Sequence, residues 1–173
     1  MSREYLVKSL AFGFWIIATG GSVAQTPSLS LLGRSGTPGD SITLTVSLSY
    51  NGATRPAAVQ WDLNYSTADL LLANGTFFST GMVATAAGKS VTCGVPTPGS
   101  VRCIVWGVNK ASIMDGALAS LRFQIAPSTS SSSTTVSFAK IQGADRNGAA
   151  VNMNGAVAVV AITQPPSVLA PQL

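Results

Sequence analysis

Hydrophobic and polar residues alternate with a period of two along most of the chain from residue 28 onward. The clearest run covers residues 42–49, in which large apolar residues alternate with threonine and serine. Such alternation is typical of a β-strand with one buried face and one solvent face. Glycine, proline, asparagine and aspartate interrupt the pattern at short intervals, as they do at turns. The rhythm therefore predicts an antiparallel β-sandwich or barrel.

The segment from residue 58 to residue 65 is a second strong strand candidate. Alternate side chains of a strand point to opposite faces. We expect the large apolar side chains of one parity to face the core, namely Val59, Trp61, Leu63 and Tyr65. The other parity faces solvent and holds Ala58, Gln60, Asp62 and Asn64.

Further strands are predicted at residues 68–72, 89–93, 101–108, 117–125, 135–141 and 155–162. In the strand at 117–125, Leu118 shares one side with Ser120 and Arg122, while larger apolar residues dominate the other side. No segment shows the apolar stripe of period 3.6 that marks an amphipathic helix. Serine, threonine and valine are frequent and form helices poorly. The chain after its first residues is therefore predicted to be all-β.

The first 24 residues predict a secretory signal peptide. Basic residues precede an apolar run at 10–18, and Ser22-Val23-Ala24 places small residues where a signal peptidase reads them. A membrane anchor would need about 20 apolar residues, more than this run holds. The proline-rich residues 164–173 predict an extended tail. We therefore expect a secreted, extracellular bacterial protein with one domain at residues 26–163 and no membrane span in the mature chain.

The amino-acid composition excludes several classes of function. Only 9% of the residues are charged and none is histidine, which excludes His-based catalytic triads and the usual His-bearing zinc sites. The basic residues after position 24 are scattered singly, whereas nucleic-acid binding normally shows as a basic cluster. We therefore expect no enzyme activity, no metal, no cofactor and no nucleic-acid partner, and a binding or structural role instead.

The acidic residues after position 24 are five aspartates. Glycosidases need two carboxylates that face each other across a cleft, and nothing in the spacing of these aspartates predicts such a pair. The run Asp145-Arg146-Asn147-Gly148 is similar to part of a calcium loop but lacks the downstream acidic ligands, so it predicts a turn. The five residues are Asp40, Asp62, Asp69, Asp115 and Asp145.

Cys93 and Cys103 lie on neighbouring strands of a predicted hairpin, joined by a loop at residues 94–100. In an exported protein such a pair predicts a structural disulfide. A catalytic dithiol would normally have the Cys-x-x-Cys spacing, which is absent here. By the chain-entropy relation, a disulfide that closes this loop stabilises the folded state by about 3 kcal/mol.

Aromatic residues raise the alternative of carbohydrate binding, because sugar rings stack on exposed aromatic faces. Trp61 and Tyr65 have the parity of the core residues. Phe77 and Phe78 are adjacent, so in an extended segment one of them points outward. We expect that ring to be the best candidate for a carbohydrate contact, unless a loop covers it.

Four sequence blocks resemble the cohesin domain family, and they occur in the family's order. Residues 36–46 resemble its opening Gly-Asp block, and residues 59–71 resemble the following strand with its conserved tyrosine position, here Tyr65. Residues 115–125 and 136–159 resemble its closing strands. Together the blocks span about Ser28 to Ile162, which is nearly the whole mature chain.

The resemblance implies a nine-stranded jelly-roll β-sandwich, akin to carbohydrate-binding modules. It also implies a module that binds dockerins through one sheet face, in extracellular assemblies that degrade polysaccharides. With Tyr65 aligned, the family's asparagine and aspartate contacts correspond to Ala58 and Gln60, so the acidic contact is missing. We take Gln60, Asp62 and Asn64 as candidate contacts with a dockerin-like protein. The alternative is a carbohydrate-binding or cell-surface adhesion module that uses Phe77 or Phe78.

Overall fold

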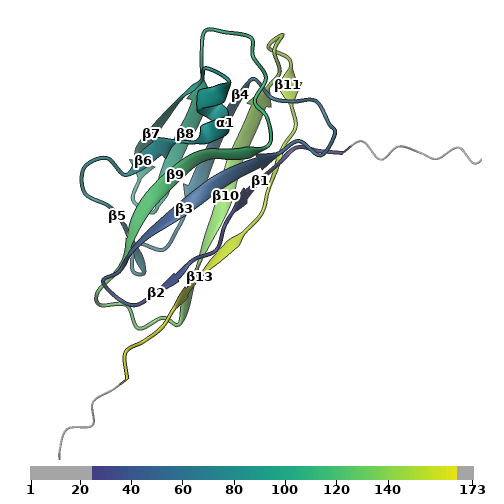
Figure 1. Ribbon diagram of the computed structural model, residues 1–173. Coiled ribbons are helices and arrows are strands. Elements are labelled where there is room, and N and C mark those ends of the chain that lie inside the picture. The colour runs from purple at the N-terminus through teal and green to yellow at the C-terminus, as the bar shows by residue number, and fades with distance from the viewer. Residues whose placement is uncertain (1–24, 167–173) are drawn as a thin grey trace, which may run out of the picture.

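Two β-sheets pack against each other in the computed structural model, which describes residues 25–166 (Figure 1). The two ends of the described chain leave at opposite ends of the sandwich (Figure 1). The predicted signal peptide at 1–24 and residues 167–173 of the predicted tail lie outside the described residues. Within residues 25–166, no helix has the length and apolar character needed to cross a membrane.

The first sheet has six strands, and its order places β3 and β9 at the centre. β6 (Phe78–Thr80) pairs with β9 beside β5. The path across the sheet is β12 (Asn154–Gly155), β1 (Ser28–Leu31), β3 (Ser41–Ser49), β9 (Gly116–Ile125) and β5 (Leu70–Leu72).

The second sheet has seven strands, with β10 and β4 at its centre. β11 (Ala150–Val151) pairs with the end of β10. The path across the sheet is β2 (Ser35–Gly36), β13 (Ala158–Ile162), β10 (Ser133–Ala144), β4 (Ala58–Asn64), β8 (Ser100–Trp106) and β7 (Ser90–Thr97).

The predicted all-β jelly-roll sandwich is confirmed. Of the thirteen strands within residues 25–166, three have only two residues each, namely β2, β11 and β12. β5 and β6 both pair with β9, so they form one interrupted strand at the edge of the first sheet. Counted in this way, the structure has the nine principal strands that the resemblance implies.

The core lies between the sheets and is built by the predicted alternation. Val59, Trp61 and Leu63 of β4 are at most 1% exposed, and the apolar residues of β3 are at most 7% exposed. Tyr65 is partly buried, and its ring meets that of Phe123 edge to face with the centroids 5.1 Å apart. The alternation therefore assigned the inward face of both strands correctly.

Helix α1 (Met82–Ala86) was not predicted, because five residues are too few to show a helical stripe. The backbone N–H of Gly81, before the helix, donates to the carbonyl of Leu118 on β9 at 2.7 Å. Gly81 lies so close to the Ala117 carbonyl that a side chain would collide with it. α1 packs on β9, and both Leu118 and its neighbour Ala119 are fully buried. A register shift between β3 and β9 leaves Leu118 as the extra residue, so the strict alternation predicted for this strand is broken there.

The prediction of a loop at residues 94–100 was wrong. β7 continues to Thr97 and β8 begins at Ser100, so only Pro98 and Gly99 form the turn. Gly99 has a φ of +81°, a conformation that glycine adopts without strain. A register shift between Gly94 and Thr97 accommodates Pro96 near the tip of the hairpin.

Candidate binding face

The predicted contact residues of β4 lie on one surface of the second sheet. We call this surface the outer face: the side chains of β7, β8, β4, β10 and β13 that point away from the first sheet. Directly opposed residues of antiparallel strands point to the same side, so the register identifies the neighbours on β8. Gln60 lies opposite Ile104, Asp62 opposite Arg102, and Asn64 opposite Ser100.

Asp62 is the centre of an ion cluster on the outer face. The Arg102 Nε donates to one carboxylate oxygen at 2.7 Å, and its Nη2 donates to the other at 2.8 Å. This is the bidentate geometry of strong guanidinium–carboxylate pairs. The Lys140 Nζ lies 3.5 Å from Asp62 Oδ2. The two cations cover the carboxylate, so Asp62 is only 3% exposed although it points outward.

The ion cluster also sets the protonation of Asp62. The hydrogen bonds from Arg102 lower the pKa of Asp62 below its ordinary value, and the charges of Arg102 and Lys140 act in the same direction. Burial of the carboxylate opposes this effect but does not cancel it. Asp62 is therefore a paired, ionised group rather than a free acid.

A β-bulge in β10 brings Lys140 to the cluster. Ala139 pairs with Asp62 and Gln142 pairs with Gln60, so two residues, Lys140 and Ile141, occupy the space opposite one residue of β4. Lys140 has a φ of +48°, a left-handed conformation that is uncommon for a residue other than glycine. Ile141 packs against the core, while the Lys140 side chain remains 69% exposed. The bulge therefore redirects one side chain, as bulges do beside functional sites.

Apolar side chains flank the ion cluster. Ile104 is 37% exposed and separates two shallow hollows in the outer face. Trp106, farther along β8, is 49% exposed, and its indole N–H donates to the Thr92 hydroxyl at 3.3 Å. One hollow is lined by Thr92, Gly94, Val95, Pro96, Arg102 and Ile104, and the other by Ala58, Val59, Gln60, Ile104, Gln142, Gly143 and Ala144.

The predicted disulfide joins Cys93 to Cys103 directly beneath the first hollow. Cys103 lies between Arg102 and Ile104 in sequence, but it points inward and is fully buried. The disulfide links the edge strand β7 to β8 at directly opposed positions. It therefore fixes the strand that forms one wall of the hollow.

The two phenylalanines of the carbohydrate hypothesis lie on the other sheet. Phe77 and Phe78 are both partly buried and pack against the core. Their rings also meet each other edge to face, with the centroids 5.4 Å apart. Neither ring is therefore a fully exposed platform, and the more exposed aromatic residue is Trp106.

The remaining aspartates serve local structure. Asp40 accepts from the backbone N–H and hydroxyl of Thr37, and Asp69 accepts from the Thr129 hydroxyl at 2.7 Å. Asp115 accepts from the backbone N–H of Tyr50 at 2.8 Å. Among residues 25–166, no group of three or more cysteine, aspartate or glutamate side chains is arranged to hold a metal ion.

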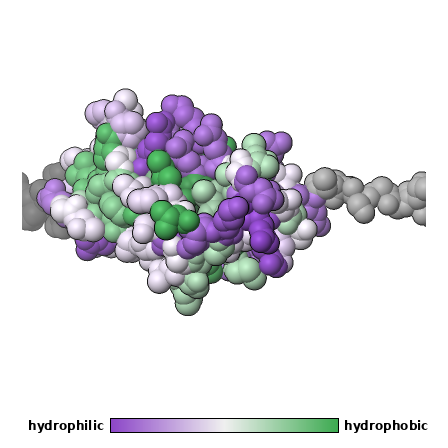
Figure 2. Space-filling view, turned by 90° about the horizontal axis from the view of Figure 1, so that it is seen from above, coloured by the Kyte–Doolittle hydropathy of each residue, from purple (hydrophilic) through white to green (hydrophobic). Residues whose placement is uncertain are grey.

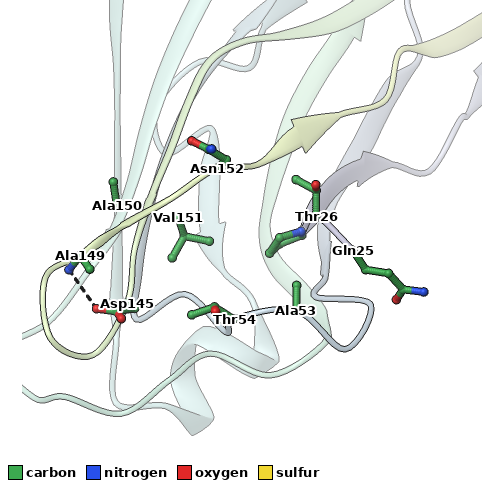
Figure 3. A pocket seen from close by; sticks show the side chains of 10 residues that line it. Gln25, Thr26, Ala53, Thr54, Asp145, Ala149, Ala150, Val151 and Asn152 are labelled. Carbon is green, nitrogen blue, oxygen red and sulfur yellow. Dashed lines mark hydrogen bonds between the residues drawn. The ribbon is translucent and has the colours of Figure 1, made fainter. Parts of the chain in front are cut away.

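The turn predicted at Asp145 is confirmed. One oxygen of Asp145 accepts from the backbone N–H groups of Asn147 and Ala149 at 2.8 and 2.9 Å. A pocket lies beside this turn, and Asp145 points back into its own loop there (Figure 3). Across the end of the molecule seen in Figure 2, small hydrophobic areas are separated by hydrophilic ones.

The alternation of side chains along the strand could have predicted three further residues of the outer face, although the sequence analysis did not single them out. In the predicted strand at 101–108, the parity opposite to the buried Cys103 holds Arg102, Ile104 and Trp106. Lys140 could not be found in this way, because regular alternation gives no sign of the bulge. The positions of Gln60, Asp62 and Asn64 on the outer face agree with prediction, although Asp62 is covered by Arg102 and Lys140. The role of all three as contacts stays a prediction.

Comparison with known proteins identifies the fold family. The Cohesin domain family matches residues 27–163. The sixth cohesin of scaffoldin B from Acetivibrio cellulolyticus, solved in complex with a Cel5 dockerin mutant, has a TM-score of 0.69 and 19% identity over 80% of this chain and 99% of that chain. Comparison with the curated proteins found no match.

Two further solved structures extend the likeness. CaCohA2 from Clostridium acetobutylicum has a TM-score of 0.66 and 19% identity, over 81% of this chain and 92% of that chain. A non-cellulosomal cohesin from the archaeon Archaeoglobus fulgidus has a TM-score of 0.66 and 14% identity, over 80% and 91%. At these identities the structural likeness establishes the fold, and the match to the family over most of the sequence shows that this chain belongs to the cohesin domain family.

Proposed function

We propose that the chain is a secreted, non-catalytic binding module that recognises a dockerin-type protein through the outer face. The observation that carries this proposal is the arrangement of that face: exposed Ile104 between two hollows, next to the Asp62–Arg102–Lys140 cluster. Protein interfaces take most of their energy from a few well-placed anchors with a polar surround. The relative from Acetivibrio cellulolyticus was solved with a dockerin bound, which supports the same class of partner here.

The location of the protein and its domain limits belong to the same proposal. Residues 1–24 would direct export, residues 26–163 would form the binding domain, and residues 164–173 would form a tail. The Cys93–Cys103 disulfide supports an oxidising compartment. A role beside polysaccharide-degrading enzymes follows from the family, and the non-cellulosomal relative indicates that this role is not obligatory.

Calorimetry with the dockerin modules of the producing organism and the Cel5 dockerin tests the proposal. We expect Ile104→Arg to weaken binding at least about tenfold, which corresponds to about 1.4 kcal/mol, because a charge replaces the apolar anchor. Leu71→Arg is the matched control: Leu71 is 41% exposed, similar to Ile104, but it lies on the other sheet. Equal effects of the two variants, or no binding by any of these dockerins, would contradict the proposal.

A further inference from the structure

The outer face carries an excess of positive charge. The five described strands that form it, β7, β8, β4, β10 and β13, contain three charged residues: Asp62, Arg102 and Lys140. Asp62 is the only anion among them, and its two oxygens are held by Arg102. The face therefore offers a partner one uncompensated positive charge and no accessible carboxylate.

Lys140 is the group that presents this charge. Its side chain is 69% exposed, whereas that of Arg102 is 37% exposed and already forms two hydrogen bonds to Asp62. The bulge holds the lysine outward at a left-handed φ of +48°. Residues kept in such conformations gather at functional sites, because only the surrounding structure makes them tolerable.

The lysine also lies close to the apolar anchor. Gln60 of β4 pairs with Ile104 on one side and with Gln142, two residues after Lys140, on the other. Strands in a sheet are about 4.8 Å apart, so Ile104 and the backbone of β10 are separated by about 10 Å. One surface of a single partner can therefore contact both.

We propose that the partner presents a carboxylate to Lys140 and an apolar side chain to the hollows beside Ile104. This inference rests on the proposed function and adds the chemistry of the partner. Complementary charges at an interface steer association and select the partner. The opposite polarity, a basic group that pairs with Asp62, would have to displace Arg102 from a bidentate contact.

The test compares two charge reversals against the tightest dockerin found by calorimetry. Lys140→Glu inverts the charge of the outer face. Lys110→Glu makes the same change in net charge at an exposed loop residue outside that face. We expect Lys140→Glu to weaken binding at least tenfold at 50 mM salt and Lys110→Glu to change it less than twofold. We also expect the wild-type affinity to fall with added salt, since the contact is ionic. Glutamate keeps the strain of lysine at this position, and a melting curve checks that the fold is retained.

A second measurement makes the inference specific. Each acidic residue of the dockerin is changed to lysine in turn, and one such variant should restore binding to Lys140→Glu. Binding that depends on Ile104 but is affected equally by the two reversals overturns this inference and leaves the proposed function intact. Stronger binding by Lys140→Glu overturns it as well, because it reveals a basic partner. Failure of every dockerin to bind overturns both.

Discussion

Lys140 combines an unfavourable backbone conformation with an exposed charge. The left-handed region costs a residue with a Cβ about 1–2 kcal/mol, and the 3.5 Å contact with Asp62 returns at most about 1 kcal/mol at such an exposed side chain. Folding stability alone therefore does not explain a lysine here. The position is better explained by what its side chain can contact.

Replacing Lys140 by glycine and by valine separates these contributions. Glycine tolerates the φ of +48°, and its extra freedom in the unfolded chain offsets part of the gain. We expect Lys140→Gly to change the free energy of unfolding by less than about 1 kcal/mol, and Lys140→Val to lower it by about 1–2 kcal/mol. Urea unfolding measures both, and equal stabilities for the two variants would show that the residue is not held in the left-handed region.

Asp62 makes the stability depend on pH. Its pKa is lowered in the folded protein by Arg102 and Lys140, so the unfolded chain binds the proton more tightly. The stabilisation is complete above the unfolded pKa of about 3.9 and is lost as the pH falls through the lower, folded value. We expect Asp62→Asn to be about 1–2 kcal/mol less stable than the wild type at pH 7, with the gap closing below about pH 4. A gap that stays constant from pH 7 to pH 2.5 in urea titrations would argue against the ion cluster.

Sequence parity predicted which residues of β4 point outward, but not what they contact. Parity depends only on local alternation. The ion pair of Asp62 depends on the register of β8 and on an extra residue in β10, both of which are set by pairing over long sequence distances. The expectation that Asp62 contacts the partner therefore did not include the two cations that cover its carboxylate.

At the scale of elements, the β7–β8 hairpin contributes both to the stability of the fold and to the proposed binding site. Its outward residues line the hollow, and its inward residues include the disulfide. In the part of the chain that the structure describes, β7 is an edge strand that pairs only with β8 within its sheet. Since an edge strand is held from one side, the disulfide gives β7 a covalent link to its single neighbour in addition to the hydrogen bonds.

Removal of the disulfide tests this role. We expect Cys93→Ala/Cys103→Ala to be about 3 kcal/mol less stable than the oxidised wild type, from the closure of an eleven-residue loop. The wild type reduced with dithiothreitol is the control and should lose a similar amount. Guanidinium unfolding measures both, and a loss below about 1 kcal/mol in both samples would rule out a stabilising disulfide.

The failures of the sequence-based prediction at α1 and at the β7–β8 hairpin have clear physical causes. α1 is too short to show a helical period, and Leu118 is the extra residue at a register shift between β3 and β9, where regular alternation does not hold. The β7–β8 hairpin was predicted with too long a loop, because prolines and glycines were read as turn signals. In the structure a register shift lets β7 continue past Gly94 and Pro96, and only Pro98 and Gly99 form the turn.

At the scale of the molecule, the order of sequence blocks was enough to predict the fold. The jelly roll is specified by the order of apolar strands and turns along the chain. Each of these strands and turns can be predicted from its own short stretch of sequence. The sign of the charge on the outer face could not be predicted from the sequence, because it depends on which charged residues the folded strands bring together. A chain with few charges places three of them on one surface, and this concentration appears only after folding.

The central claim also concerns the whole molecule: the outer face of the second sheet is the surface that binds a protein. Nuclear magnetic resonance of the isotope-labelled chain with an unlabelled dockerin tests it most directly. We predict that signals of Gln60, Asn64, Ile104 and Lys140 shift or broaden on addition of the dockerin, while those of β1 and β3 in the first sheet stay in place. Perturbations centred on the first sheet, or none anywhere at saturating dockerin, would contradict the account.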